Sequence, residues 1–542
     1  MTKTGFLPRT ARRLALAAAV LALALPAAAS ERAAITATLR ADRPQGTVSR
    51  HIFGQFAEHL GTGIYGGIWV GADSKIPNTR GYRDDALEAL RALEVPVVRW
   101  PGGCFADEYH WRDGIGPRGK RPVRVNTSWG GVEESNAFGT HEFMDFAELI
   151  GADAYVSGNV GNGTPEEMAG WVEYITSDTG STLARERRRN GRERPWKLPF
   201  FGVGNELWGC GGNMRAEYAA DLHRRYQTFV KSPPGQKIVK VAAGANGDDL
   251  HWTEVFMREA RGHMDALSLH NYTVPGDWPP RASSTDFDET AWTETLALAL
   301  RMDGLIAKHT AIMDRYDPEK KVALFVDEWG TWYAGLPGSN PGFLQQQNTL
   351  RDALVAALHF DIFVRHSDRV RMANIAQMAN VLQAVILTRD DKLVLTPTYH
   401  AFDMYRPFQD ATALPLDIAA PTYSQGQWSV PAVHGSAVRG RDGRVHVALT
   451  NLDPQDGAEV AMRLEGVSAA SVSGRILTAP TITAKNTFDQ PETVQPVVFR
   501  GARIDGDTLQ VTLPARSIVM LRLDATDSAA RRGSDADAKA GR

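Results

Sequence analysis

The sequence predicts an α/β fold class, a (β/α)8 TIM barrel that carries an antiparallel β-sandwich domain. Three observations lead to this prediction. Apolar strands alternate with amphipathic helices eight times between residues 51 and 396, which is the pattern of a closed parallel barrel. Long connections at 107–140 and 273–289 follow strand ends, where such a barrel carries its active-site loops. Beyond Pro397, short strands with period two appear between turn residues.

The predicted barrel strands are short apolar runs. In chain order they cover residues 52–56, 95–100, 154–157, 200–203, 238–243, 266–269, 322–326 and 371–375. Helical spacing of apolar residues predicts helices between them, as at 84–93, where two acids open the helix. Thr164 followed by Pro165 predicts another helix start, because Thr caps free N–H groups and proline fits the first turn.

The chain divides into five predicted segments: a signal peptide at 1–29, N-terminal strands that join the β-sandwich at 30–50, the catalytic barrel at 51–396, the β-sandwich at 397–524 and a disordered tail at 525–542. The sandwich is predicted from alternating strands at 445–449, 460–464, 508–513 and 518–523. The leader has basic residues, then an apolar run at 14–25 and an A-x-A site at 27–29. We therefore expect an exported protein, periplasmic or secreted, with no membrane anchor once the leader is removed.

The charge balance argues against nucleic acid as the main partner. The chain is 43% hydrophobic and 23% charged, with a formal net charge of -3, whereas phosphate binding needs a concentrated positive field. The clearest basic cluster lies at 185–194. We expect a solvated surface loop there, with docking of an anionic polymer as the alternative.

Cys104 and Cys210 are the two cysteines of the chain. Both follow candidate barrel strands, so they could be neighbours, but the sequence leaves open whether they form a disulfide. Two cysteines lack the paired spacing of a zinc site. We expect no metal and no organic cofactor.

Two predicted strands end in a carboxylate, Glu206 after strand four and Glu328 after strand seven. The ends of these strands face each other across the mouth of a barrel. Two facing carboxylates suit glycoside hydrolysis, in which one acid is protonated and the other ionised. A separation of about 5–5.5 Å gives retention of configuration, and about 6.5–9.5 Å gives inversion.

Five motifs follow one another along the chain: 54–60 (GQFAEHL), 99–105 (RWPGGCF), 111–117 (WRDGIGP), 204–206 (GNE) and 327–330 (DEWG). Through them, nearly all of the mature chain resembles an α-L-arabinofuranosidase of glycoside hydrolase family 51. The resemblance implies a (β/α)8 barrel with a sandwich built from the C-terminal part and N-terminal strands, and a retaining mechanism. It also implies that Glu206 is the acid/base and Glu328 the nucleophile.

The resemblance implies substrate-binding roles for six further residues: Glu58, Cys104, Asn205, Tyr272, Trp332 and Gln377. Asn205 would bond the sugar 2-hydroxyl, Glu58 would bind furanose hydroxyls and Tyr272 would lie near the nucleophile. Gln377 would line the sugar pocket, and Trp332 would form a wall of it. Many intracellular members of the family have Asn where this chain has Cys104, and a thiol is a weaker hydrogen-bond partner. The contact would then come from the Cys104 backbone or be lost.

Several neighbouring residues keep structural alternatives. Glu58 beside His59 could form a buried ion pair, and Asp327 is expected to point away from the pocket as a structural residue. His270 could orient the nucleophile or fill the barrel. Arg99 is expected to hold a carboxylate of the pocket.

The expected function is that of an exo-glycosidase in hemicellulose degradation and L-arabinose metabolism. It would release terminal non-reducing α-L-arabinofuranosyl residues from arabinan, arabinoxylan or arabino-oligosaccharides by double displacement. The alternatives are another barrel glycosidase, such as an endo-xylanase or endo-glucanase, and a non-catalytic carbohydrate-binding protein. The preferred polymer and the oligomeric state stay open, although family members often form homo-oligomers.

Overall fold

The computed structural model describes residues 34–276 and 278–525. The predictions of a signal peptide at 1–29 and of a tail beyond residue 525 therefore lie outside the described residues. Within the described part, none of the helices has the length and apolar character that crossing a membrane requires.

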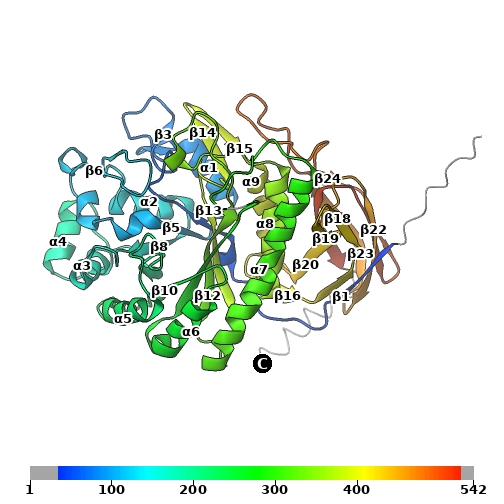
Figure 1. Cartoon of the computed structure of the whole chain (residues 1–542), viewed down its shortest axis with the longest axis horizontal. Helices are drawn as coiled ribbons and strands as arrows, with labels where there is room; N and C mark the ends of the chain where they lie inside the picture. Colours follow the sequence, from blue (N-terminus) through cyan, green and yellow to red (C-terminus); the bar gives the residue numbers. More distant parts are fainter. Residues whose placement is uncertain (1–33, 277, 526–542) are drawn as a thin grey trace, which may run out of the picture. The chain divides into compact units, whose positions relative to one another are not determined.

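A closed barrel of parallel strands forms the centre of the catalytic part, in the order β10-β11-β12-β13-β2-β5-β8-β9 (Figure 1). The strands are β2 (Gly54–Phe56), β5 (Val97–Trp100), β8 (Asp153–Gly158), β9 (Phe200–Val203), β10 (Val239–Asn246), β11 (Ala266–Thr273), β12 (Ala323–Thr331) and β13 (Val370–Ala376). Each pairs in parallel with its neighbours, and β13 closes onto β2. The predicted (β/α)8 fold class is confirmed, because each predicted strand coincides with a barrel strand to within a few residues.

Helices follow the barrel strands. They are α1 (Asp84–Ala92), α2 (Thr140–Ile150), α3 (Pro165–Thr176), α4 (Thr182–Arg189), α5 (Ala216–Gln227), α6 (Leu250–Glu259), α7 (Glu289–Tyr316), α8 (Leu350–Arg365) and α9 (Pro397–Tyr405). The hydroxyl of Thr164 accepts a hydrogen bond from the N–H of Glu167, and Pro165 occupies the first turn of α3. The predicted helix start at this position is confirmed.

The prediction of a surface loop at 185–194 is wrong for residues 185–189, which are helical, whereas residues 190–194 form a turn and loop at the surface. The first half of the cluster belongs to α4, which Ser181 caps through its hydroxyl. Arg187 is fully buried, and its guanidinium donates to the backbone carbonyls of Tyr174 and Ser177. These residues can form a helix because Arg187 satisfies buried carbonyls, while all the other charged side chains of α4 reach solvent.

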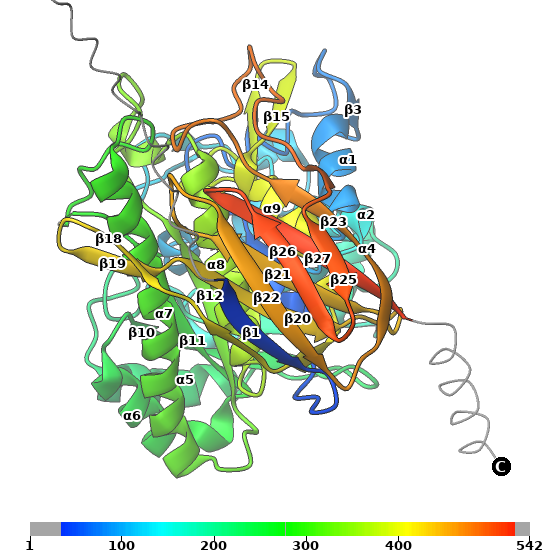
Figure 2. The ribbon, with the colours of Figure 1, turned by 90° about the vertical axis from the view of Figure 1, so that its right-hand side faces the viewer.

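Two sheets form the β-sandwich, in the orders β17-β1-β22-β26-β25 and β16-β20-β21-β27-β23-β24. The first contains the N-terminal strand β1 (Ile35–Arg40), together with β22 (Ala458–Glu465) and β26 (Thr508–Leu513). Figure 2 shows β1, drawn in dark blue, beside the C-terminal strands. The predicted share of N-terminal residues in the sandwich is confirmed. The pairing of β1 with β22 is parallel, whereas the other strand pairs of the sandwich are antiparallel. Because β1 is far from β22 in sequence, no short hairpin turn fixes their relative direction.

Buried polar contacts join the sandwich to the barrel. Asp361 on α8 accepts hydrogen bonds from Tyr405 on α9 and from His434 and Ser436 on β20 (Val433–Arg439). Almost all of α8 is buried. The helix therefore contacts both the barrel part and the sandwich, and it is the next α-helix after the strand that carries Glu328.

Candidate active site

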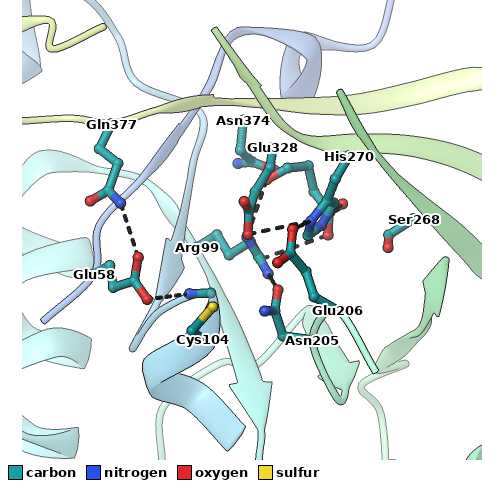
Figure 3. Close-up of polar contacts among 12 residues, drawn as sticks. Glu58, Arg99, Cys104, Asn205, Glu206, Ser268, His270, Glu328, Asn374 and Gln377 are labelled. Carbon is teal, nitrogen blue, oxygen red and sulfur yellow. Dashed lines mark hydrogen bonds and ion pairs between the residues drawn. The ribbon is translucent and has the colours of Figure 1, made fainter. Parts of the chain in front are cut away.

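The predicted site residues meet at the carboxyl ends of the barrel strands, around a cavity of about 510 Å³. Seven of the eight line this cavity: Glu58, Cys104, Glu206, Tyr272, Glu328, Trp332 and Gln377. The eighth, Asn205, is buried beside it. Figure 3 shows side chains from several strands of the barrel pointing toward one another at this point.

Glu206 lies on a sharp turn directly after β9. Its φ angle is +42°, which is unusual for a residue with a side chain, and Gly204 before it has φ +86°. The carbonyl of Glu206 accepts hydrogen bonds from the N–H groups of Gly209 and Gly211, at 2.7 and 3.1 Å. The glycine-rich sequence after the strand therefore closes a tight turn that aims the Glu206 side chain into the cavity.

Glu328 lies inside strand β12, at a bulge. Ser268 pairs with Phe325, and two residues further along β11 His270 pairs with Glu328, so β12 holds one extra residue at this point. A bulge lets two consecutive side chains turn to the same side of a strand. Asp327 consequently also faces the barrel interior, where it contacts Tyr155 and His270; its direction therefore differs from the prediction, but it does not line the cavity, as expected of a structural residue.

The carboxylates of Glu206 and Glu328 are close. One oxygen of each lies within 4.8 Å of the other, together with a ring nitrogen of His270. His270 Nδ1 is 2.8 Å from Glu206 Oε1 and 3.5 Å from Glu328 Oε1. This separation falls short of the gap of about 6.5–9.5 Å that an inverting pair needs for a water molecule.

The two acids have different electrostatic surroundings. Burial and the negative charge of Glu328 raise the pKa of Glu206, and His270 opposes this shift. Burial would lower the pKa of His270, but Glu328, with Asp327 and Glu206, raises it to about 10. His270 is therefore a cation that bridges Glu206 and Asp327, whose Oδ1 lies 3.2 Å from Nε2. Of the two predicted roles for His270, orienting a carboxylate is the one the contacts favour, and its nearest carboxylate is Glu206.

Two donors hold Glu328. Arg99 Nη1 donates to Oε1 at 2.7 Å, and the Tyr272 hydroxyl donates to Oε2 at 2.8 Å. Burial and the carboxylates nearby raise the pKa of Tyr272 well above its usual value, so the phenol keeps its proton. The structure thus places Tyr272 and Arg99 against the predicted nucleophile, as the sequence predicts for both.

Glu58 is the centre of a second network on the opposite side of the cavity. Its Oε1 accepts from the N–H groups of Gly103 and Phe105, at 3.0 and 3.1 Å, and from the Trp129 indole at 2.8 Å. Its Oε2 accepts from Gln377 Nε2 at 3.1 Å. Burial and the charge of Glu328 raise the pKa of Glu58 to about 7.

The alternative of an ion pair between Glu58 and His59 is wrong. His59 Nδ1 instead contacts Glu134 Oε2 at 2.8 Å. The two side chains diverge because Glu58 is held by backbone N–H groups that no other acceptor satisfies. Glu134 lies far from His59 in the sequence, in the long connection that follows β5, and no local sequence pattern predicts this contact.

Two amide groups leave a polar atom unused. Asn205 Oδ1 accepts from Arg99 Nη2 at 2.5 Å, but Asn205 Nδ2 is buried with no hydrogen-bond partner in the described residues. The same holds for Gln377 Oε1, while its Nε2 contacts Glu58. A buried polar group without a partner is costly, so both atoms are suited to hydroxyl groups of a bound molecule.

Aromatic side chains form part of the cavity wall. Trp332 packs edge-on against Tyr272, with ring centroids 5.0 Å apart, and against Trp278, at 5.2 Å. Trp278 is 68% exposed. Sequence reasoning missed Trp278 as part of the site; Trp129, one of several tryptophans near the motifs that suit a sugar-binding crevice, also lines the cavity. Their place in the two long loops after strand ends was the available signal.

Cys104 and Cys210 form a disulfide, with Cα atoms 5.5 Å apart. Both residues line the cavity. The Cys104 side chain is therefore bonded to sulfur and is no thiol donor to a ligand, while its backbone neighbours, Gly103 and Phe105, hold Glu58.

A metal ion does not suit the carboxylate cluster. Glu206, His270 and Glu328 each offer a ligand atom within 4.8 Å of one another. A metal-binding histidine must be neutral, and the pKa of His270 is raised to about 10 by its carboxylates. The Arg99 guanidinium also contacts Glu328, so two positive charges already occupy the surroundings.

A second cavity, of about 930 Å³, lies between α9 and the sandwich strands. Its acids are paired: Asp403 contacts Arg475 at 2.8 Å, and Asp442 contacts Arg444 at 3.2 Å. Among the described residues that line it, no two carboxylates face each other as Glu206 and Glu328 do in the smaller cavity.

Comparisons with known proteins agree with the geometry. The family description "Alpha-L-arabinofuranosidase C-terminal domain" matches residues 327–517, and "Alpha-L-arabinofuranosidase 1 domain" matches residues 89–286. An "Intracellular exo-alpha-L-arabinofuranosidase" of Bacteroides ovatus is 50% identical over 92% of this chain and 98% of its own length.

Solved structures are also similar. A family 51 arabinofuranosidase from Xanthomonas axonopodis pv. citri is 67% identical, with a TM-score of 0.90, over 91% of this chain and all of that one. The arabinose complex of the Thermotoga maritima α-L-arabinofuranosidase is 30% identical, with a TM-score of 0.80, over 90% of this chain and 99% of that one.

The prediction of export is contradicted. The Bacteroides ovatus relative, which matches almost the whole chain, is named an intracellular enzyme. The leader-like pattern lies in residues 1–29, outside the described residues. A basic start followed by an apolar run does not by itself establish that a segment directs export.

Proposed function

The chain belongs to the α-L-arabinofuranosidases of glycoside hydrolase family 51, and from this premise we propose that Glu206 and Glu328 hydrolyse terminal non-reducing α-L-arabinofuranosyl residues by double displacement. The observation that carries the proposal is the pair itself. Its oxygens approach within 4.8 Å, burial and the charge of Glu328 raise the pKa of Glu206, and Arg99 and Tyr272 donate hydrogen bonds to Glu328.

In the first step, the Glu328 carboxylate attacks the anomeric carbon while Glu206 gives its proton to the leaving oxygen. Arg99 and Tyr272 hold Glu328 in one orientation. Burial and the negative charge of Glu328 keep the pKa of Glu206 raised, which favours the protonated acid that this step needs. The products are a covalent arabinosyl-Glu328 ester and the freed alcohol.

In the second step, Glu206 is a carboxylate and takes a proton from water, which attacks the anomeric carbon of the ester. Glu328 leaves as a carboxylate and arabinose departs. The loss of the Glu328 charge in the intermediate removes the repulsion that raises the pKa of Glu206. The same residue can therefore act as an acid in one step and as a base in the next.

The sugar would be held by the groups on the two sides of the pair. Asn205 Nδ2, which has no partner within the described chain, suits the 2-hydroxyl, and Glu58 with Gln377 suits the remaining hydroxyls. Trp332 offers an apolar face. The substrates would be arabinan, arabinoxylan or arabino-oligosaccharides, all of which carry terminal arabinofuranosyl groups.

The test compares p-nitrophenyl α-L-arabinofuranoside with p-nitrophenyl β-D-xylopyranoside, and then arabinoxylan. We expect turnover of the arabinofuranoside, release of free arabinose and a xylan backbone of unchanged length. Product NMR taken at early times should show the α anomer first. A shortened backbone would instead indicate an endo-acting enzyme, and an initial β anomer would indicate inversion.

A further inference from the structure

The Cys104–Cys210 disulfide joins two segments that hold opposite sides of the cavity. Cys104 opens the short helix η2 (Cys104–Asp107), which follows β5, and Cys210 lies in the turn that follows β9. The two residues are 106 positions apart in sequence. In the barrel, β8 lies between β5 and β9, so the disulfide bridges across the end of an intervening strand.

On the η2 side, the linked segment organises both networks of the site. The N–H groups of Gly103 and Phe105, on either side of Cys104, hold Glu58. Asp107 accepts from the N–H of Asn205 at 2.8 Å. The short helix thus contacts the residue directly before Glu206 as well as the sugar-side carboxylate.

On the β9 side, the linked segment is the turn of Glu206. Cys210 Sγ lies 3.6 Å from Glu206 Oε2, while His270 Nδ1 holds Glu206 Oε1 at 2.8 Å. A disulfide sulfur has no hydrogen, so it contacts Oε2 without donating to it. The carboxyl group is therefore fixed between a cation on one oxygen and a non-donating sulfur on the other, on a backbone with positive φ.

We propose that the disulfide is a positioning device for the acid/base, holding Glu206 so that Oε2 carries its proton toward the leaving group of the glycoside. This inference rests on the proposed function, because it gives Glu206 the acid role. Cys104, Cys210 and Trp208 line the cavity beside Glu206, so they form the wall that the leaving sugar meets. Cys210 acts through Glu206 and is a positioning residue.

The proposal makes the acid sensitive to a dithiol reductant. Two electrons and two protons pass from the dithiol to the sulfurs, the S–S bond breaks into two thiols, and the dithiol closes to its own disulfide. The turn loses its covalent tie to η2. The new Cys210 S–H can also donate to Glu206 Oε2, which favours the carboxylate over the acid.

The test is the ratio of kcat/KM on arabinobiose to kcat/KM on 2,4-dinitrophenyl α-L-arabinofuranoside, measured for wild type, Cys210→Ala and Cys210→Ser. Arabinobiose needs a proton on its leaving oxygen and dinitrophenolate does not. We expect the ratio to fall about tenfold in both variants and in dithiothreitol-treated wild type, and to recover on reoxidation. The ratio is independent of the fraction of folded enzyme.

An equal loss on both substrates would mean that the disulfide only stabilises the fold and would overturn the proposal, as would a ratio within twofold of wild type. If wild type turned over neither substrate, the proposed function itself would fail, which is a separate outcome. Asn213→Gly, in the same turn but outside the cavity lining, is the matched control and should keep the wild-type ratio, because glycine adopts the positive φ of this position without strain.

Discussion

The turn of Glu206 and the strand of Glu328 bring equivalent side chains to one cavity by different means. Glu328 belongs to a barrel strand with neighbours on both sides, and charged or phenolic donors hold both of its oxygens. Glu206 lies on a tight turn with positive φ, between His270 and a disulfide sulfur.

The difference matches the chemistry that each acid would perform. A nucleophile needs one protonation state and a fixed direction. The ion pair between Arg99 and Glu328, which lies on a barrel strand, provides both. An acid/base must give up and regain a proton. Its surroundings should therefore raise its pKa and still allow the carboxylate to form. Four substitutions test this comparison.

The largest effect is expected at the strand. Glu328→Ala should lower kcat by about 10⁴-fold or more on every arabinofuranoside, because no other group within the described site can form the ester. Steady-state kinetics on p-nitrophenyl α-L-arabinofuranoside measures this. Glu328→Gln, which has nearly the same shape, is the control for packing and should be comparably inactive. Turnover near that of wild type would remove Glu328 from the mechanism.

Substitution at the turn should depend on the substrate. Glu206→Ala should lower kcat/KM on arabinobiose by about 10²–10⁴-fold and affect the dinitrophenyl glycoside far less, because that leaving group departs without a proton. Added azide should accelerate the variant with the dinitrophenyl substrate and give an α-configured arabinosyl azide. Equal losses on both substrates would contradict the acid role.

Removal of the Arg99 guanidinium should disturb the strand more than the turn. Arg99→Met leaves the buried Glu328 carboxylate without its ion-pair partner, so we expect a loss of about 3–5 kcal/mol in unfolding free energy and about 10²-fold in kcat/KM. Arg99→Lys keeps the charge but cannot reach both Glu328 and Asn205, and should fall between the two. Denaturant titration beside kinetics checks both effects, and an Arg99→Met enzyme as stable as wild type would contradict the prediction.

The smallest expected effect is a shift in pH dependence. The acid form of Glu206 is the active one in kcat/KM, so activity falls as pH rises through the pKa of Glu206. Burial and Glu328 raise this pKa, and the His270 cation lowers it. His270→Gln should therefore move the alkaline limb of the kcat/KM profile upward by about one pH unit. His141→Gln, which replaces a half-buried histidine on α2 that does not line the cavity, should leave the limb in place. A downward shift in His270→Gln would contradict the assignment.

The sequence was sufficient to predict the strands and both carboxylates. Each strand is an apolar run, and Glu206 and Glu328 end such runs, so local patterning carries the information. The inward turn of Asp327 depends on a bulge that only pairing with β11 and β13 reveals. The contact of His59 with Glu134 and the disulfide join segments far apart in sequence. Whether such segments come into contact depends on the arrangement of strands in the folded barrel, which local sequence patterns do not determine.

The helix at 182–189 shows a different limit. A run of arginines is typical of an exposed segment, but the guanidinium of Arg187 donates hydrogen bonds to buried backbone carbonyls. Which arginine turns inward depends on the neighbouring helix α3 and on the chain that follows.

The most direct test of the account is the mass of the Glu206→Ala enzyme mixed with 2,4-dinitrophenyl α-L-arabinofuranoside. Without its base, the variant should form the glycosyl-enzyme rapidly and hydrolyse it slowly. Intact-protein mass spectrometry should then show a gain of one anhydropentose, and peptide mapping should place it on Glu328. An adduct on another residue, or the absence of an adduct while the dinitrophenol is released, would contradict the division of roles between the strand and the turn.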